Sequence, residues 1–414
     1  MTNSLLEETA ARWRFTVHRR SFAIGGFART TGIGEITDAR SRRLEIGWNE
    51  PAKLTFTVDG RSPSAALIQE LTTDIMAWRW DPEDGTEHLM FRGVVSATED
   101  TISAQAHSVN VTATDYFGML LRRYLNPAAD LVYTQTDQDT IVADLRTRAT
   151  TGQAPAAGTP SFAPGSFLPL DVVRVNADGS ARAALSGQLR DRTYTGGSVV
   201  GSLISDLSAV INGFDFDIQP AADVDGIDHL RVWYPSRGVS RNDLALVYGS
   251  TVSALTRSVA SSEYSNYIRV LGDNGGTPPQ MIAEAWNADA NDVGRIPVGL
   301  WAAVDSQSDV KVAATLKQKA DGDLALQGVL VPSYSLTLRP GWYRPGFPAI
   351  GDTVPLVVKS GRLDVSATVR VIGLNYAISD DATEDVEVAV ARPALTLTAL
   401  FTKTRRDVDA LARR

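Results

Sequence analysis

The stretch LTFTVDGRSPSAALIQELTTDIMAWR at residues 54–79, followed by HLMFRGVV at residues 88–95, switches between strand and helix patterns. Its first residues alternate apolar and polar side chains, which is typical of a half-buried strand. Ser62 and Pro63 predict a helix start, because a serine side chain caps free backbone N–H groups and proline has none to lose. Alternation returns in DIMAWRW, and the PEDG that follows predicts a hairpin turn. The region predicts a small β-unit with one short helix.

The rest of the chain extends this pattern over several domains. It has 414 residues, of which 43% are hydrophobic and 21% charged, an ordinary composition for a folded globular protein. A stretch rich in Gly, Ala and Pro predicts a flexible loop at 150–169, and the last third alternates Val, Leu and Ile between frequent turns. The predicted fold is therefore mainly β (α+β). The expected parts are a first small β-rich unit over 1–125, completed by 229–272, a mixed α/β insertion over 126–228, a second small barrel or sandwich with one helix over 273–398, and a short C-terminal helix over 399–414.

Helices are expected where apolar residues recur at helical spacing, most clearly after a capping residue. Gly322 interrupts the last of them and costs about 1 kcal/mol relative to Ala in a helix interior. Two strands that follow each other directly, at 214–218 and 229–234, predict a hairpin with the loop AADVDGID. The expected helices cover residues 62–71, 115–125, 137–149, 198–212 and 309–326.

Composition excludes several classes of protein. The chain has no cysteine, so disulfide frameworks, thiolate zinc sites and cysteine nucleophiles are absent. Its net charge of −8 is the opposite of the basic footprint of a nucleic-acid binder. The first residues lack the apolar core of a signal peptide, and no stretch approaches the roughly 18 apolar residues of a membrane-spanning helix. We therefore expect no export signal, no membrane span and no specific DNA binding.

Catalytic and cofactor motifs are also missing. No Gly-Lys pair and no G-x-S-x-G elbow occurs, which argues against a phosphate-binding loop and a hydrolase serine. The run Asp223, Asp225 and Asp228 has only part of a calcium loop and is more typical of an acidic hairpin loop. We expect no enzymatic activity, no cofactor and no metal site. The four histidines are single and have no i, i+4 partner histidine: His18, His88, His107 and His229.

Paired carboxylates are the hardest catalytic signal to dismiss, because a glycosidase needs only two suitably spaced acids and no local motif. Asp215 and Asp217 share one face of the strand FDFDI. Both this pair and a second group in a predicted turn are more consistent with solvent-facing polar positions. The second group is Asp380, Asp381, Glu384 and Asp385.

Aromatic residues suggest a binding surface. Trp78 and Trp80 alternate along a strand, and Trp342 and Tyr343 lie in RPGWYRPGFP. Exposed rings at such spacing stack on sugars, although core packing or a contact between subunits is more usual. These four residues are candidates for a subunit interface or a glycan site.

The order of parts, two β-units around a mixed insertion with a short tail, resembles the tail-tip or baseplate hub proteins of long-tailed bacteriophages. Their fold is shared with the trimeric hub of contractile tails. The stretch at 54–79 with 88–95 is similar to the strand, helix and strand of the first hub domain, and the likeness covers most of the chain. Other stretches that carry it are DYFGMLLRRYL (115–125), TGGSVVGSLISDLSAVINGFDFDI (195–218), SEYSNYIRVLG (262–272), GDTVPLVV (351–358) and VRVIGLNYAIS (369–379).

The resemblance implies a structural virion protein at the phage tail tip, made in the host cytoplasm. It implies a homotrimer with two related β-barrels per subunit, so that six similar units match a sixfold tail tube and frame the DNA exit channel. The implied partners are the distal tail protein, the tape measure protein and tip fibre or spike proteins. DNA passes through the lumen without specific binding, and an acidic wall keeps phosphates from adhering. The candidate lumen residues are Asp215, Asp217, Asp380, Asp381, Glu384 and Asp385.

Two other functions stay open from the sequence. A carbohydrate-binding adhesin would use the aromatic loops around Trp78 and Trp342 to hold host surface polysaccharide. A glycosidase or peptidoglycan hydrolase would depend on Asp217. Tail type, host and receptor are not readable from the residues.

Overall fold

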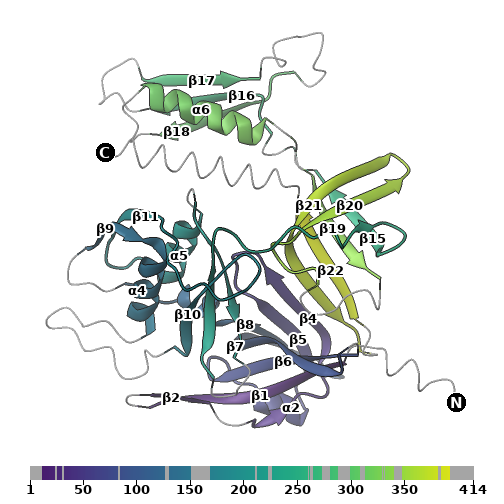
Figure 1. The fold of residues 1–414 in the computed structure, drawn as a ribbon. Helices are drawn as coiled ribbons and strands as arrows, with labels where there is room; N and C mark the ends of the chain where they lie inside the picture. Colours follow the sequence, from purple (N-terminus) through teal and green to yellow (C-terminus); the bar gives the residue numbers. More distant parts are fainter. Residues whose placement is uncertain are drawn as a thin grey trace. The chain divides into compact units, whose positions relative to one another are not determined.

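The chain folds mainly into β-strands, as predicted (Figure 1). It divides into a large unit, built from residues up to 208 with 214–255 and 335–390, and a small unit built mainly from 256–334. The computed structural model describes residues 12–23, 26–29, 32–82, 84–125, 130–150, 168–209, 212–221, 226–259, 261, 264–272, 280–287, 299–307, 313–328, 330, 332–339, 347–380 and 384–391.

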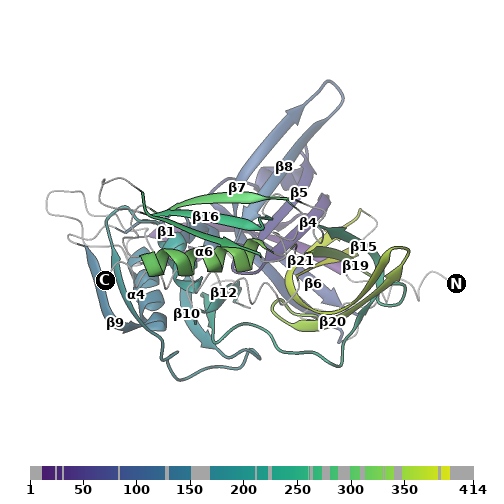
Figure 2. The same ribbon diagram turned by 90° about the horizontal axis from the view of Figure 1, so that it is seen from above.

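One curled sheet of 14 strands forms most of the large unit (Figures 1 and 2). Its path runs β15-β19-β22-β21-β4-β5-β8-β7-β6-β1-β2, so the last strands of the chain pair with the first ones. The hairpin of β7 and β8 projects from the sheet (Figure 2). The strands from the first part of the chain are β1 (Arg12–Ala23), β2 (Gly26–Arg29), β3 (Gly34–Glu35), β4 (Arg40–Gly47), β5 (Lys53–Asp59), β6 (Thr73–Asp81), β7 (Thr86–Ile102) and β8 (His107–Thr114).

The C-terminal strands continue the same sheet. β21 is antiparallel to both β20 and β4, and this second pairing joins the two ends of the sequence. The alternation of Val, Leu and Ile places one row of side chains in the core, including Val354, Leu356 and Val358 of β20. These strands are β14 (Leu246–Val247), β15 (Val252–Ser258), β19 (Ser333–Leu338), β20 (Thr353–Ser360), β21 (Leu363–Ile378) and β22 (Glu384–Ala391).

The short helix after β5 begins as predicted. The Ser62 hydroxyl accepts a hydrogen bond from the Ala65 N–H at 3.3 Å, and Pro63 is the first residue of α2 (Pro63–Leu67). The helix is shorter than expected, because the backbone is extended at Ile68 and has a positive φ at Leu71, whose side chain is exposed.

A mixed region between the two sets of strands packs helices and small sheets around its own apolar core. β13 pairs with β10 in parallel and with β12 in the predicted antiparallel hairpin. Residues 229–233 therefore belong to this region, although the range 229–272 was expected to complete the first β-rich unit. The elements are α3 (Tyr116–Leu120), β9 (Leu131–Asp137), α4 (Gln138–Thr150), β10 (Leu170–Val175), β11 (Leu189–Tyr194), α5 (Val200–Ser208), β12 (Asp215–Gln219) and β13 (Asp228–Trp233).

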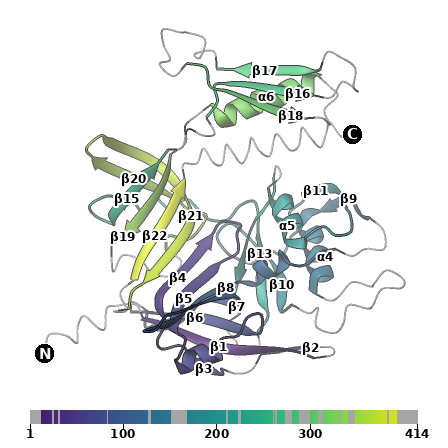
Figure 3. The ribbon, with the colours of Figure 1, turned by 180° about the vertical axis from the view of Figure 1, so that it is seen from behind.

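The small unit is a three-stranded sheet with one helix on a face (Figure 3). β16 (Tyr267–Gly272) lies between β17 (Ile282–Trp286) and β18 (Ala302–Gln307). The helix α6 (Ala313–Gln327) packs Leu316 and Ala320 against the sheet and runs unbroken through Gly322. Most of the expected loop at 150–169 and the whole tail at 399–414 lie outside the described residues.

Candidate functional site

The predicted pair Asp215 and Asp217 lies in a buried cluster with three arginines, which we call the junction cluster. Asp215 is buried, and its Oδ2 accepts hydrogen bonds from Arg370 Nη2 at 2.9 Å and from the Arg237 N–H at 2.7 Å. Asp217 is mostly buried and accepts a hydrogen bond from Arg231 Nε at 2.9 Å, while Arg237 Nη1 lies 3.0 Å away. Both side chains were expected to face solvent, and the structure places them among cations instead.

Electrostatics in the junction cluster favour the ionised form of Asp217. Burial alone would raise the pKa of Asp217, but the charges of Arg237 and Arg231 outweigh it and hold that pKa below its ordinary value. Trp233 Nε1 also donates to Asp217 Oδ1 at 2.9 Å, and the Arg231 guanidinium lies 4.7 Å from the centre of the Trp233 ring. The cluster is therefore bound internally by charge and hydrogen bonds.

The backbone is also tightly packed at the junction cluster. Arg370 Nη2 donates to the Arg237 carbonyl at 2.9 Å, and Arg370 Nε donates to the Gly351 carbonyl at 3.1 Å. Gly238 has a φ of +88°, and a Cβ there would lie 2.1 Å from the carbonyl carbon of Gly351. Asn49 lies between β4 and β5, and its Oδ1 accepts a hydrogen bond from the Phe216 N–H at 2.8 Å. The cluster thus joins early strands, the mixed region and late strands of the large unit.

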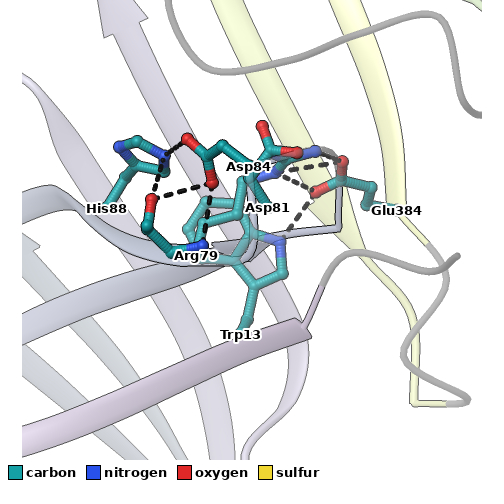
Figure 4. A network of polar contacts seen from close by, with 7 residues as sticks. Trp13, Arg79, Asp81, Asp84, His88 and Glu384 are labelled. Atoms are coloured by element: carbon teal, nitrogen blue, oxygen red, sulfur yellow. Dashed lines mark hydrogen bonds and ion pairs between the residues drawn. The ribbon is translucent and has the colours of Figure 1, made fainter. Parts of the chain in front are cut away.

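A second polar group links β6 and β22 of the curled sheet through side chains, which we call the closure of the sheet. β22 and β6 are not neighbours in the sheet, yet Glu384 at the start of β22 accepts from Arg79 Nε at 3.1 and 3.0 Å (Figure 4). Trp13 Nε1 donates to the same carboxylate at 2.8 Å, and the Trp13 ring meets Tyr376 edge-on at 5.4 Å. Glu384, one of the candidate lumen residues, therefore has partners within the subunit.

The turn between β6 and β7 carries an acidic group beside that closure, which we call the tip cluster: Asp81, Asp84, Thr86 and His88. Asp84 Oδ2 lies 2.7 Å from His88 Nε2, and the Thr86 hydroxyl donates to Asp84 Oδ1 at 2.7 Å (Figure 4). The hydroxyl and N–H of Thr86 hold the pKa of Asp84 below its ordinary value. One oxygen of Asp81, one of Asp84 and one nitrogen of His88 lie within 4.8 Å of one another.

The other predicted candidates have simpler surroundings. Asp380 and Asp385 are exposed, and Asp381 lies outside the described residues. Trp78 and Trp80 are half-buried, and the guanidinium groups of Arg14 and Arg12 lie over their rings at 5.3 and 5.5 Å. Each described ring thus has a cation on its face. Trp342 and Tyr343 lie outside the described residues.

Asp228, the third acid of the calcium-like run, forms a buried ion pair within the subunit. Arg92 Nη1 lies 2.6 Å from Asp228 Oδ1, and both side chains are completely buried between β7 and β13. The Ala221 N–H also donates to this oxygen at 2.9 Å. Asp223 and Asp225 lie outside the described residues.

Solved structures resemble the chain over nearly its whole length. A tail protein from Neisseria meningitidis MC58 is 13% identical, with 95% of this chain and 98% of that chain covered and a TM-score of 0.51. The 43 kDa tail protein of prophage MuSo2 from Shewanella oneidensis is 11% identical, with 93% and 99% covered and a TM-score of 0.54. This chain has the fold of these tail proteins.

The tail-protein fold also occurs in a larger chain. A chain in the Francisella PdpA-VgrG complex is 10% identical, and the match covers 94% of this chain but 60% of that chain, with a TM-score of 0.51. No family model and no curated protein sequence matches this chain. The sequence-based resemblance to phage tail proteins is confirmed at the level of the fold.

Sequence reasoning missed the arginines of the junction cluster and the grouping of the tip cluster. One signal was present for Asp217, because the predicted hairpin of β12 and β13 pairs Asp217 with Arg231. Arg370 is 155 residues from Asp215, so no local pattern predicts their contact.

Within the described ranges, none of the helices combines the length and apolar character needed to cross a bilayer.

Proposed function

We propose that this chain is a structural tail protein whose homotrimer forms the hub at the phage tail tip. In this role it joins the end of the tail tube to the tip complex and frames the DNA exit channel. The observation that carries the proposal is the tail-protein fold, which covers 93–95% of this chain and 98–99% of the two tail proteins. No catalytic step is part of the role.

The large unit supports this role through its sheet. Strands from both ends of the sequence share one continuous curled surface, and the junction cluster fixes the mixed region against it. A ring of such subunits covers open strand edges, which would otherwise pair with other chains. If the early strands β4–β8 and the late strands β19–β22 of this sheet supply two similar halves per subunit, three subunits would give the six units that a sixfold tube needs.

Charge supports passage of DNA without specific binding. The net charge of −8 repels phosphates at any wall that carries the excess acids. Asp380 and Asp385 are exposed and are the described acids best suited to a lumen, whereas Asp215, Asp217 and Glu384 already bind cations inside the subunit. The proposed partners are the distal tail protein, the tape measure protein and tip fibre or spike proteins.

The mass of the purified protein in solution tests the proposal. Light scattering over a range of concentrations should give a trimer of about 134 kDa, three times the 44.5 kDa chain, or a monomer that moves toward that mass on concentration. Electron microscopy of the large species should show threefold rings. A strict monomer at every concentration, especially one that binds host polysaccharide, would reject the hub and favour the adhesin.

A further inference from the structure

The β6–β7 hairpin gathers metal-ligating side chains on one face. The register pairs Asp81 with Thr86 and Arg79 with His88. Paired residues and residues two apart on a strand share a face, so these four side chains lie on the same side of the hairpin. Asp84 lies in the turn between the strands and reaches the same side, where it contacts Thr86 and His88 (Figure 4).

The spacing of the ligand atoms suits a single small cation. Zinc binds carboxylate oxygen and imidazole nitrogen at about 2.0–2.2 Å in tetrahedral geometry, so the donors around one ion lie about 3.3–3.6 Å apart. The donor atoms of Asp81, Asp84 and His88 lie within 4.8 Å of one another, so side-chain shifts of up to about 1.5 Å bring them to one ion. Thr86 already holds Asp84 in this position through its hydroxyl and N–H, at 2.7 and 2.8 Å.

The local charge is an independent argument for a cation. Asp81 and Arg79 are almost completely buried, at 4% and 2% exposure, and Arg79 Nη1 lies 3.5 Å from Asp81. The same guanidinium binds the Glu384 carboxylate through Nε and Nη2, so its single charge is shared between two acids. Among the contacts of the described residues, the group with Asp84 has three carboxylates against one guanidinium, a formal charge of −2 when His88 is neutral. One divalent cation restores neutrality.

We propose that Asp81, Asp84 and His88 bind a divalent transition-metal cation of the zinc class. Two carboxylates with an imidazole favour such a cation over calcium or magnesium, which prefer oxygen ligands alone. Three protein ligands leave positions for water or for a group from a neighbouring molecule. The bound ion links the hairpin turn to the side chains that close the curled sheet, because Arg79 contacts both Asp81 and Glu384.

Calorimetric titration tests the site on the full chain after removal of metals with EDTA. Zn²⁺ should bind at one ion per chain, whereas Ca²⁺ and Mg²⁺ should not bind over the same concentration range. The substitutions Asp84→Asn and His88→Gln should each weaken Zn²⁺ binding at least tenfold. The matched control is His107→Gln, because His107 also lies 2.7 Å from an aspartate, Asp100, but belongs to no three-ligand group in the described residues.

A spectroscopic readout separates binding from folding. Co²⁺ added to the metal-free protein should give a visible absorption band in the wild type and in His107→Gln, and the band should be lost in His88→Gln. Circular dichroism in EDTA should be the same for all four proteins, because Asp84 is exposed in the turn and His88 is only half-buried near the start of β7. The proposal is overturned if Zn²⁺ does not bind, if His88→Gln binds it as the wild type does, or if His107→Gln weakens it equally.

Discussion

The junction cluster and the tip cluster begin from the same kind of sequence, two acids a few residues apart, and end in opposite surroundings. Asp215 and Asp217 meet the guanidinium groups of Arg231, Arg237 and Arg370. Asp81 shares one guanidinium, that of Arg79, with Glu384, and Asp84 contacts His88 and Thr86. We expect from this comparison that the number of cations that the fold brings to a carboxylate decides whether it stabilises the subunit or can bind a ligand.

The largest expected effect comes from the backbone of the junction cluster. Gly238→Ala should lower the free energy of unfolding by about 3 kcal/mol or more, because φ is +88° and the new Cβ meets the Gly351 carbonyl. Urea unfolding measures this change. Gly322→Ala is the matched control, since a Cβ there meets nothing within 4 Å, and it should stabilise α6 by about 0.5–1 kcal/mol. Equal midpoints for Gly238→Ala and wild type would contradict the close packing.

Removal of one cation from the junction cluster should lower the free energy of unfolding by nearly as much. Arg370→Met leaves Asp215 buried without its guanidinium and should cost about 3 kcal/mol in urea unfolding. The double variant Arg370→Met with Asp215→Asn should recover part of this loss, because the uncompensated charge is gone. If the double variant is less stable than the single one by the full effect of Asp215→Asn, the two side chains are not coupled.

A third buried acid, Asp115, extends the comparison to the pH dependence of the unfolding free energy. Asp115 accepts hydrogen bonds from the backbone N–H groups of Ala52, Phe117 and Gly118, and burial raises its pKa to about 7. Its folded pKa lies above the unfolded value of 3.8, so its contribution to stability is complete below pH 3.8 and is lost as pH rises through about 7. Between these values the unfolding free energy should fall by up to about 1.4 kcal/mol per pH unit relative to Asp115→Asn.

Asp217 should show the opposite sign. The arginines hold its folded pKa below the unfolded value of 3.8, so its contribution is present at neutral pH and is lost as pH falls through the folded pKa. Between pH 2 and 5 the free energy of unfolding should therefore rise more steeply with pH in the wild type than in Asp217→Asn. Parallel curves for the two proteins would show that the arginines do not act on this carboxylate.

The smallest effect is expected at the tip cluster in the absence of metal. Asp84→Asn should leave the midpoint of thermal unfolding in EDTA nearly unchanged, because the side chain is exposed. Thermal unfolding with and without EDTA measures this difference. A large loss in EDTA would show that the turn depends on Asp84 itself and would remove the contrast with the junction cluster.

The features that the sequence predicted correctly are those that depend on neighbouring residues. Ser62 and Pro63 start α2, Asp115 caps α3, and the alternating runs form strands of a mainly β fold. The junction cluster depends on distant pairing, because Arg370 reaches Asp215 only after β21 has joined β4. The tip cluster is local, within eight residues, but its pattern Asp-x-x-Asp-x-x-x-His has a single histidine and so lacks the i, i+4 histidine pair that marks a metal site in sequence.

The pairing of β21 with β4 has a consequence for synthesis on the ribosome. Arg43 of β4 and Asn375 of β21 are hydrogen-bonded across 332 residues. At about 5–20 residues per second, β4 waits about 15–65 seconds for its partner, with one edge open to other nascent chains. A chain that stops before β21 would keep that edge open for its whole lifetime, so truncated products of this gene should aggregate rather than accumulate as soluble fragments.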